Sequence, residues 1–364
     1  MQVIAVGETV HSGLSAGGTW RILTIDGGGI KGVFPAAFLA ELEERLGEPI
    51  VDYFDLIAGT STGGIIALAL GLGLTAKEIL QLYENNAHRI FPQSRSFAFQ
   101  GIFRAKYAKA ALPTVLREAF GQRLLGESRA RLLIPSLNLS SERVHIYKTS
   151  HHPGLVKDYT LSAVDVALAT VAAPTYFPVH LSPEGVPFVD GSVWARNPMG
   201  LAVIEAIGVL EWPRESIRLL SLGCTATRMD VSWSSWKKHT SLGAAFWAAR
   251  LADVFMTAQS SSAVVTAHVL LGPNSVFRFD PDMSQHNFTL DGVRHMPLLR
   301  QLGEKEASDA FGALAPVFFQ GKAAAFVPCH HLPSPPATTP QPTVVTARAA
   351  PSRLADMASP RRVR

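Results

Sequence analysis

Two strand-and-helix units, each interrupted by a glycine-rich turn, occupy the first 75 residues and constrain the fold more than any other feature. Trp20 to Ile25 is a short apolar run that stops at the glycines of 26–29, and a helical pattern follows. Tyr53 to Ala58 leads in the same way into the glycine-rich segment 59–64 and an apolar helix from Ile65. Because strand, helix and strand in succession connect parallel strands, the sequence predicts an α/β fold with a mostly parallel central sheet.

Later segments continue this mixture of patterns. Helices are predicted at 76–87, 113–120, 162–171, 242–269 and 296–312, and strands at 131–139, 144–148, 188–189, 217–222 and 276–279. Ser162 and Asp165 have the spacing of a capping box, which favours a helix start there. No internal repeat is visible, so a solenoid or propeller is not expected.

The net charge of +4 is concentrated in the C-terminal segment. From Pro328 onward there are five arginines, no lysine and one acid, Asp356, whereas residues 1–327 hold 28 basic and 28 acidic side chains. This segment has eight prolines among 37 residues, which predicts a disordered tail. The alternative is an arginine-bearing arm that touches anionic lipid or nucleic acid. Residues 1–327 have no net charge, which gives no reason to expect a nucleic acid polymer as partner.

The cysteine pattern and the N-terminus favour an intracellular, cytoplasmic protein. Cys224 and Cys329 stand 105 positions apart, which fits neither a disulfide framework nor a metal knuckle. The histidines show no ligand spacing, so no metal site is predicted. The first 18 residues lack a secretion signal, and the uncharged stretch 56–76, with its five glycines, predicts a buried helix, not a membrane span.

The segment 59–63 has the pattern G-x-S-x-G, in which a serine lies on a sharp turn between a strand and a helix. Gly59 and Gly63 are needed because the turn packs too tightly for a Cβ at either flank. The start of the helix places Ser61 in the positive end of the helix dipole. The pattern predicts a nucleophilic serine, and a structural turn with a buried serine is the alternative.

The segment 26–32, Asp-Gly-Gly-Gly-Ile-Lys-Gly, also follows a predicted strand. It matches the dinucleotide fingerprint G-x-G-x-x-G, but the acid that a dinucleotide site needs at the end of the second strand is absent. A P-loop requires Ser or Thr after the lysine, and Gly32 follows Lys31. The remaining interpretation is an oxyanion hole formed by backbone N–H groups at a helix start.

Asp190 ends a short predicted strand and precedes Gly191 and Ser192. An aspartate at a strand end is where an α/β enzyme holds a general base. An Asp-Gly pair is also common in plain turns, which leaves that interpretation open.

Together and in this order, the three motifs at 26–32, 59–63 and 190–192 resemble those of the patatin-like phospholipase family. The segment 172–178 is similar to the stretch that precedes the catalytic aspartate in that family. Lys31 stands where arginine is commoner, and Ser192 where glycine or alanine is commoner. The resemblance implies a three-layer α/β/α fold, with 20–225 as the lipase domain. The remaining predicted parts are an N-terminal extension, a mainly helical C-terminal part and the tail, at 1–19, 226–327 and 328–364.

The resemblance implies a serine acyl hydrolase that releases fatty acids from membrane phospholipids without a cofactor. It implies a dyad in which Asp190 is the base for Ser61. The oxyanion hole is then assigned to the glycine loop with Gly27, Gly28, Gly29 and Lys31. A Ser, Asp, His triad with His268 or His286 is the alternative, although neither histidine lies in a motif.

The segment 85–117 contains no acid but has six basic and five aromatic residues. Such interleaving suits an anionic membrane surface or a phosphorylated ligand, and a covering loop with solvated cations is the alternative. Arg95, Arg104 and Lys106 are the candidate ligand-binding cations.

Compact patatin-like proteins of this length resemble the bacterial phospholipase effectors of CBASS anti-phage systems. That resemblance implies activation by a cyclic dinucleotide and action on the inner membrane surface, and a homodimer is also considered. One alternative is a constitutive lipid acyl hydrolase without nucleotide control. Another is a non-catalytic regulatory protein whose glycine loop binds phosphate or nucleotide.

Overall fold

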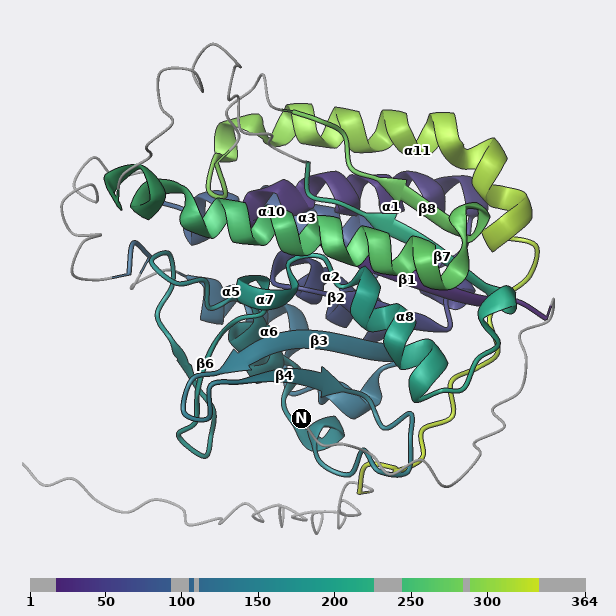
Figure 1. Ribbon diagram of the computed structural model, residues 1–364, viewed down its shortest axis with the longest axis horizontal. Helices are drawn as coiled ribbons and strands as arrows, with labels where there is room; N and C mark the ends of the chain where they lie inside the picture. The colour runs from purple at the N-terminus through teal and green to yellow at the C-terminus, as the bar shows by residue number, and fades with distance from the viewer. Residues whose placement is uncertain (1–17, 93–104, 108–110, 226–243, 284–288, 334–364) are drawn as a thin grey trace, which may run out of the picture. The chain divides into compact units, whose positions relative to one another are not determined.

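The computed structural model describes residues 18–92, 105–107, 111–225, 244–283 and 289–333. Within these residues one sheet has the strand order β5-β6-β3-β2-β1-β7-β8, with β4 on the other edge of β3 (Figure 1). The strands are β1 (Trp20–Ile25), β2 (Leu56–Gly59), β3 (Arg131–Asn138), β4 (Arg143–Lys148), β5 (His180–Leu181), β6 (Pro187–Asp190), β7 (Ile217–Leu222) and β8 (Val276–Phe279). The strands β3, β2, β1, β7 and β8 are parallel to one another, which confirms the predicted α/β class.

Helices cover both faces of this sheet. They are α1 (Val33–Leu46), α2 (Thr62–Gly71), α3 (Ala76–Ile90), α5 (Leu112–Phe120), α6 (Ala163–Val171), α7 (Ser192–Ala195), α8 (Met199–Gly208), α10 (Ala244–Leu271) and α11 (Met296–Phe318). Alternate side chains of β1 point to opposite faces, as a strand requires. Leu23 and Ile25 pack with α1, α2 and α11, whereas Trp20 and Ile22 pack with α8 and α10. The three-layer α/β/α architecture is therefore confirmed.

The site is positioned by two strands that share one edge of β3. Along that edge, β2 runs parallel to β3 and pairs Ala58 with Leu133. Further along, β6 runs antiparallel and pairs Asp190 with Ser136. The two strands therefore point toward each other, and their C-terminal ends meet.

Several predicted elements have different bounds in the structure, among them the helix predicted at 76–87, which ends at Ile90. The strand predicted from Tyr53 begins at Leu56, because Ile50–Tyr53 forms a short 3-10 helix. The last helix continues past its predicted end at 312 to Phe318, with Pro316 inside it. The capping box predicted for Ser162 and Asp165 was wrong in its partner: the Ser162 side chain caps the helix by accepting a hydrogen bond from the N–H of Val164, not from that of Asp165.

The C-terminal part of the described chain is tied to the N-terminal ends of the strands. Arg21 of β1 donates to the carbonyl oxygens of Phe318 (2.5 Å) and Gly321 (2.5 Å). The N–H of Cys329 donates to the carbonyl oxygen of Ser150 (2.6 Å). The first residues of the predicted tail are thus bonded to the body, and Met1–Leu332 forms one compact unit. The predicted domain boundaries stay predictions.

One helix of the described residues is long and apolar enough to cross a membrane by length and composition, Leu251–Leu271 within α10. Helices of that length and composition also occur in proteins that do not cross membranes. The uncharged stretch considered in the sequence contains α2, whose ten residues are all buried.

Candidate active site

The serine of the G-x-S-x-G segment lies at the turn between β2 and α2. Ser61 has a positive φ of 55° with ψ at −122°, a conformation that costs energy for any residue except glycine. Ser61 is 8% exposed, so its neighbours enclose it almost completely. Strain of this kind persists when the surrounding contacts hold the backbone in place.

Two glycines make this turn sterically feasible. A Cβ on Gly59 would lie 2.1 Å from the carbonyl oxygen of Gly63, and a Cβ on Gly63 would lie 2.3 Å from that of Ile25. Real Cβ atoms do not approach backbone atoms so closely. Any side chain at either position would therefore displace β2 or α2 and move Ser61.

Asp190 lies against Ser61, at the point where β6 and β2 meet. The Ser61 hydroxyl donates to Asp190 Oδ2 at 2.6 Å, and the N–H of Ser192 donates to Oδ1 at 2.7 Å. Burial raises the pKa of Asp190 to about 6, although the hydrogen bond from Ser61 opposes the shift. The carboxylate is therefore a stronger base than an ordinary aspartate.

Thr170 of α6 links the two halves of this arrangement. Its hydroxyl accepts a hydrogen bond from the N–H of Ser61 (3.0 Å) and donates to the carbonyl oxygen of Pro135 in β3 (2.6 Å). Its own carbonyl oxygen accepts from the N–H of Gly191 (3.3 Å). One buried threonine thus fixes the backbone beside both Ser61 and Asp190.

The glycine loop between β1 and α1 packs directly on Ser61. A Cβ on Gly27 would lie 3.2 Å from the Cβ of Ser61. Within the described residues, the N–H groups of Gly28 and Gly29 have no hydrogen-bond acceptor. The N–H of Gly27 is occupied, because it donates to the carbonyl oxygen of Arg196 (2.9 Å). Two of the three glycines assigned to an oxyanion hole therefore carry available donors.

The backbone of this loop is held from outside. Gly29 has a φ of +59°, and a Cβ there would lie 2.2 Å from the carbonyl oxygen of Leu290. The same oxygen accepts from the N–H of Ile30 (2.8 Å). A Cβ on Gly28 would lie 2.3 Å from the Cβ of Cys224. Glycine is thus required at both positions.

Lys31 is buried, at 2% exposure, and does not extend into solvent. Its ammonium group donates to the carbonyl oxygen of Thr225 at 3.2 Å. Burial, together with the positive charge of Arg196, lowers the pKa of Lys31 to about 8. The lysine joins the loop to the segment after β7, a supporting position that differs from a direct oxyanion contact.

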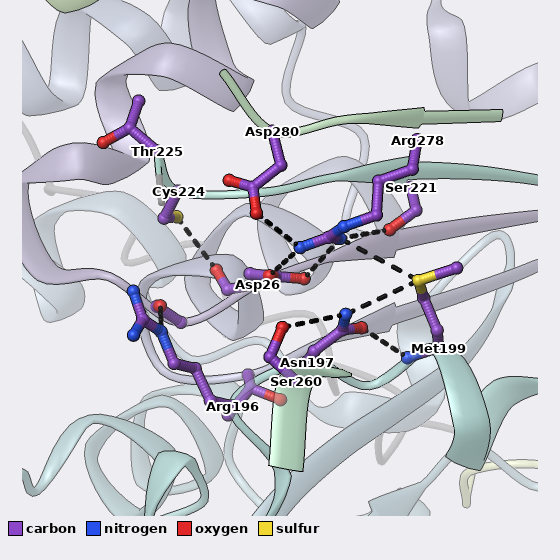
Figure 2. A network of polar contacts seen from close by, with 12 residues as sticks. Asp26, Arg196, Asn197, Met199, Ser221, Cys224, Thr225, Ser260, Arg278 and Asp280 are labelled. Carbon is purple, nitrogen blue, oxygen red and sulfur yellow. Dashed lines mark hydrogen bonds and ion pairs between the residues drawn. The ribbon is translucent and has the colours of Figure 1, made fainter. Parts of the chain in front are cut away.

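A buried ion-pair network anchors the start of the loop (Figure 2). Arg278 of β8 binds both oxygens of Asp26, at 3.2 and 2.7 Å, and Asp26 directly precedes Gly27. Arg278 also donates to Ser221 (2.7 Å) and Asp280 (2.9 Å). The Cys224 thiol donates to the backbone oxygen of Asp26 (3.2 Å). Three strands therefore hold one end of the glycine loop.

Within the described residues, no hydrogen bond supports a triad that includes a histidine. His268 bonds to the carbonyl oxygen of Val264 in its own helix through Nδ1 (2.9 Å). His286 lies outside the described residues. The carboxylate of Asp190 bonds to Ser61 and Ser192, and no described histidine is among its partners.

Of the three candidate ligand-binding cations, Arg95 and Arg104 lie outside the described residues. Lys106 is described, and its ammonium group pairs with the carboxylate of Asp291. It also lies over the rings of Tyr107 and Tyr176, at 5.3 and 5.7 Å from their centroids. Asp291 directly follows Leu290, whose carbonyl oxygen lies against Gly29. The ion pair therefore connects Lys106 to the glycine loop.

Several residues of the site were not identified from the sequence. They are Thr170, Arg196, Ser221, Cys224, Arg278 and Asp280. A signal was present for Arg278, because a charged residue in the middle of a predicted strand requires a buried partner. In the described part of the chain, no group of three or more His, Cys, Asp or Glu side chains is arranged to hold a metal ion.

Comparison with known proteins places this chain in a family. Residues 23–203 match the family model described as patatin-like phospholipase. A cGAMP-activated phospholipase of Pseudomonas aeruginosa is 35% identical over 83% of this chain and 96% of its own length. One of Vibrio cholerae is 34% identical over 59% of this chain and 67% of its own length.

A plant relative, patatin-like protein 2 of Arabidopsis thaliana, is 35% identical over 50% of this chain and 52% of its own length. Among solved structures, VipD from Legionella pneumophila is 14% identical with a TM-score of 0.43, covering 84% of this chain and 69% of that one. The long match to the Pseudomonas relative extends beyond the motifs to most of both chains. This chain belongs to the patatin-like phospholipase family and is a hydrolase.

Proposed function

We propose that Ser61 and Asp190 form the catalytic dyad of this phospholipase, with the Gly28 and Gly29 N–H groups as the oxyanion hole. The observation that carries the proposal is the 2.6 Å hydrogen bond from the Ser61 hydroxyl to the Asp190 carboxylate. It is supported by the raised pKa of Asp190, to about 6, since a general base works best when its pKa is near the working pH.

In the first step, the Ser61 oxygen attacks the ester carbonyl carbon while its proton passes to Asp190. The carbonyl oxygen becomes negative and is bound by the N–H groups of Gly28 and Gly29, which have no other acceptor among the described residues. The intermediate then collapses, the ester bond breaks, and the proton on Asp190 goes to the departing alcohol, the lysophospholipid.

In the second step, Asp190 takes a proton from a water molecule, which attacks the acyl group on Ser61. The fatty acid leaves, and the proton returns to the Ser61 oxygen. The same carboxylate therefore serves both half-reactions.

We propose that the enzyme is cytoplasmic, acts on the inner membrane surface and is activated by cGAMP in anti-phage defence, with a homodimer as its assembly. Three relatives that are 34 to 37% identical bear the name cGAMP-activated phospholipase, which supports nucleotide control. A ligand that switches the enzyme on must bind the active conformation more tightly than the inactive one. The contact of Lys106 with Asp291, whose neighbour Leu290 touches the glycine loop, offers a route from a phosphate to the site.

Two assays on purified protein test this proposal. Fluorophosphonate labelling reports an activated serine, and it is expected on wild-type protein and not on Ser61→Ala. Fatty-acid release from phospholipid vesicles is expected to be low alone and to rise sharply with cGAMP. High activity that no cyclic dinucleotide changes would support a constitutive hydrolase, and absence of both labelling and hydrolysis with cGAMP present would support the regulatory alternative.

A further inference from the structure

Arg196 is fixed against the glycine loop by two reciprocal hydrogen bonds. Its carbonyl oxygen accepts from the N–H of Gly27 (2.9 Å), and its side-chain Nε donates to the carbonyl oxygen of Gly27 (3.2 Å). These bonds leave the guanidinium little freedom to move away from the loop. The residue was not singled out in the sequence.

The two terminal nitrogens of this guanidinium have no partner among the residues that the structure describes. Within the described residues, neither terminal nitrogen of Arg196 has a hydrogen-bond acceptor, and no carboxylate lies within ion-pair distance. Figure 2 shows the contrast with Arg278, whose terminal nitrogens are engaged by Asp26 and Asp280. A planar guanidinium offers two parallel donors, a geometry that matches the oxygens of a phosphate.

The guanidinium of Arg196 is attracted by the buried carboxylate of Asp26 but makes no ion pair with it. Asp26 is the nearest buried carboxylate on the loop, and both of its oxygens are bound by Arg278. Lys31 adds a second cation, and the two charges repel, which contributes to the lowered pKa of Lys31. An anion placed beside Arg196 would relieve this repulsion.

In space, only Gly27 lies between Arg196 and the serine proposed to react. Arg196 contacts Gly27, and Gly27 packs on Ser61, with 3.2 Å between its built Cβ and the Cβ of Ser61. In a glycerophospholipid only the glycerol backbone separates the esters from the phosphodiester. A substrate with its ester carbonyl at Ser61 therefore brings its phosphate close to Arg196.

We infer that Arg196 binds the phosphodiester of the substrate head group and sets the preference for phospholipids over neutral glycerides. The inference rests on the proposed dyad at Ser61 and Asp190. The phosphodiester is assigned to the lipid and not to the cyclic dinucleotide, because Arg196 is bonded to Gly27, which packs on Ser61.

The test compares two substrates with the same acyl chains, phosphatidylcholine and diacylglycerol, in neutral detergent micelles with saturating cGAMP. The measured quantity is the ratio of their kcat/KM values, which reports recognition of the phosphate. Arg196→Gln removes the charge but keeps a donor for Gly27, and we expect the ratio to fall about tenfold or more. Arg196→Lys keeps the charge and is expected to retain most of the preference. Arg214→Gln, an exposed arginine paired with Glu215, is the matched control and should leave both rates unchanged.

Three outcomes overturn the inference. Equal loss on both substrates, with Arg196→Gln more active than Arg196→Lys, would show that the side chain only holds the glycine loop. An unchanged ratio with a higher cGAMP concentration for half-activation would assign the phosphodiester to the activator. An unchanged ratio with unchanged activation would show a solvated arginine. Failure of wild-type protein to hydrolyse either substrate would instead contradict the proposed function, so the two failures are distinguishable.

Discussion

The hydroxyl of Ser61 and the carboxylate of Asp190, 129 positions apart in the chain, are joined by a 2.6 Å hydrogen bond. They meet because β2 and β6 lie end to end along the same edge of β3. Neither strand moves independently of β3, so the separation of the two side chains is set by backbone pairing. Rigid placement of a nucleophile and its base is what an acyl-transfer site requires.

Two replacements of Ser61 distinguish its role in ester hydrolysis from the cost of its strained backbone. Ser61→Ala is expected to abolish ester hydrolysis and leave the fold intact. Ser61→Gly is expected to be equally inactive but to have a higher melting temperature than Ser61→Ala, because glycine adopts the φ of 55° without strain. Fatty-acid release and thermal unfolding measure the two effects. Substantial turnover by folded Ser61→Ala protein would exclude the dyad.

Asp190 makes the reaction pH-dependent. With a pKa raised to about 6, its carboxylate is lost as the pH falls through that value, so kcat/KM should decline below about pH 6. Asp190→Asn should lose about 100-fold or more in activity. His268→Ala is the matched control and should keep wild-type activity. A histidine variant as inactive as Asp190→Asn would restore the triad.

The same pKa shift predicts the stability of that variant. The pKa of Asp190 is above its ordinary value of 3.8, so protonation favours the folded state. The stability contributed by Asp190 is fully present below about pH 4 and is lost as the pH rises through about 6. Asp190→Asn should therefore gain in melting temperature relative to wild type between pH 4 and 8. A constant difference across that range would contradict the assignment.

Arg278 is expected to matter for both stability and rate. Arg278→Met leaves the Asp26 carboxylate buried without its partner, which costs roughly 3–5 kcal/mol in comparable cases. The double variant Asp26→Asn with Arg278→Met removes both charges and should recover part of that loss. Activity should stay low in both variants, because the glycine loop has lost its anchor. Denaturant unfolding and kcat give the two readouts, and full kcat in Arg278→Met would show that the loop is held by other contacts.

Gly28 and Cys224 should be coupled. Gly28→Ala places a Cβ 2.3 Å from the Cβ of Cys224 and should displace the loop N–H groups, with a large loss of kcat. Cys224→Gly removes that clash, so the double variant should regain part of the activity. A double-mutant cycle on kcat/KM measures the coupling. Strictly additive effects would mean that the clash is relieved elsewhere.

Two truncations locate the end of the folded body. Removal of 334–364 should leave the melting temperature unchanged. Removal of 328–364 also deletes the bonds of Cys329 and His330 to Ser150, at 2.6 and 2.7 Å, and should lower it modestly while leaving the protein folded. Equal melting temperatures for the two truncations would show that these contacts add nothing.

Much of the fold could be predicted because the parallel strands have local patterns. The bounds of β1, β7 and β8 follow directly from mostly apolar runs that end at an acid or a glycine. The turn at Ser61 was also predictable, since the two glycines and the flanking strand and helix are contiguous in sequence.

The meeting of Ser61 with Asp190 could not be derived from those patterns alone. It depends on β6 running antiparallel and occupying the part of the β3 edge that β2 leaves free. A four-residue strand carries too little periodicity to reveal its direction or partner. Pairings such as Asp26 with Arg278, separated by 252 positions, are likewise invisible to local reasoning.

The order of the chain has a consequence for biosynthesis. The ribosome releases Ser61 and then Asp190 well before Arg278, the residue that secures the start of the glycine loop through Asp26. Until β8 emerges and joins β7, a nascent chain holds the proposed nucleophile and base but lacks the residue that anchors the glycine loop. On the proposed mechanism, the phospholipase therefore stays incomplete during its own translation, and hydrolysis is expected to begin only after β8 has been made.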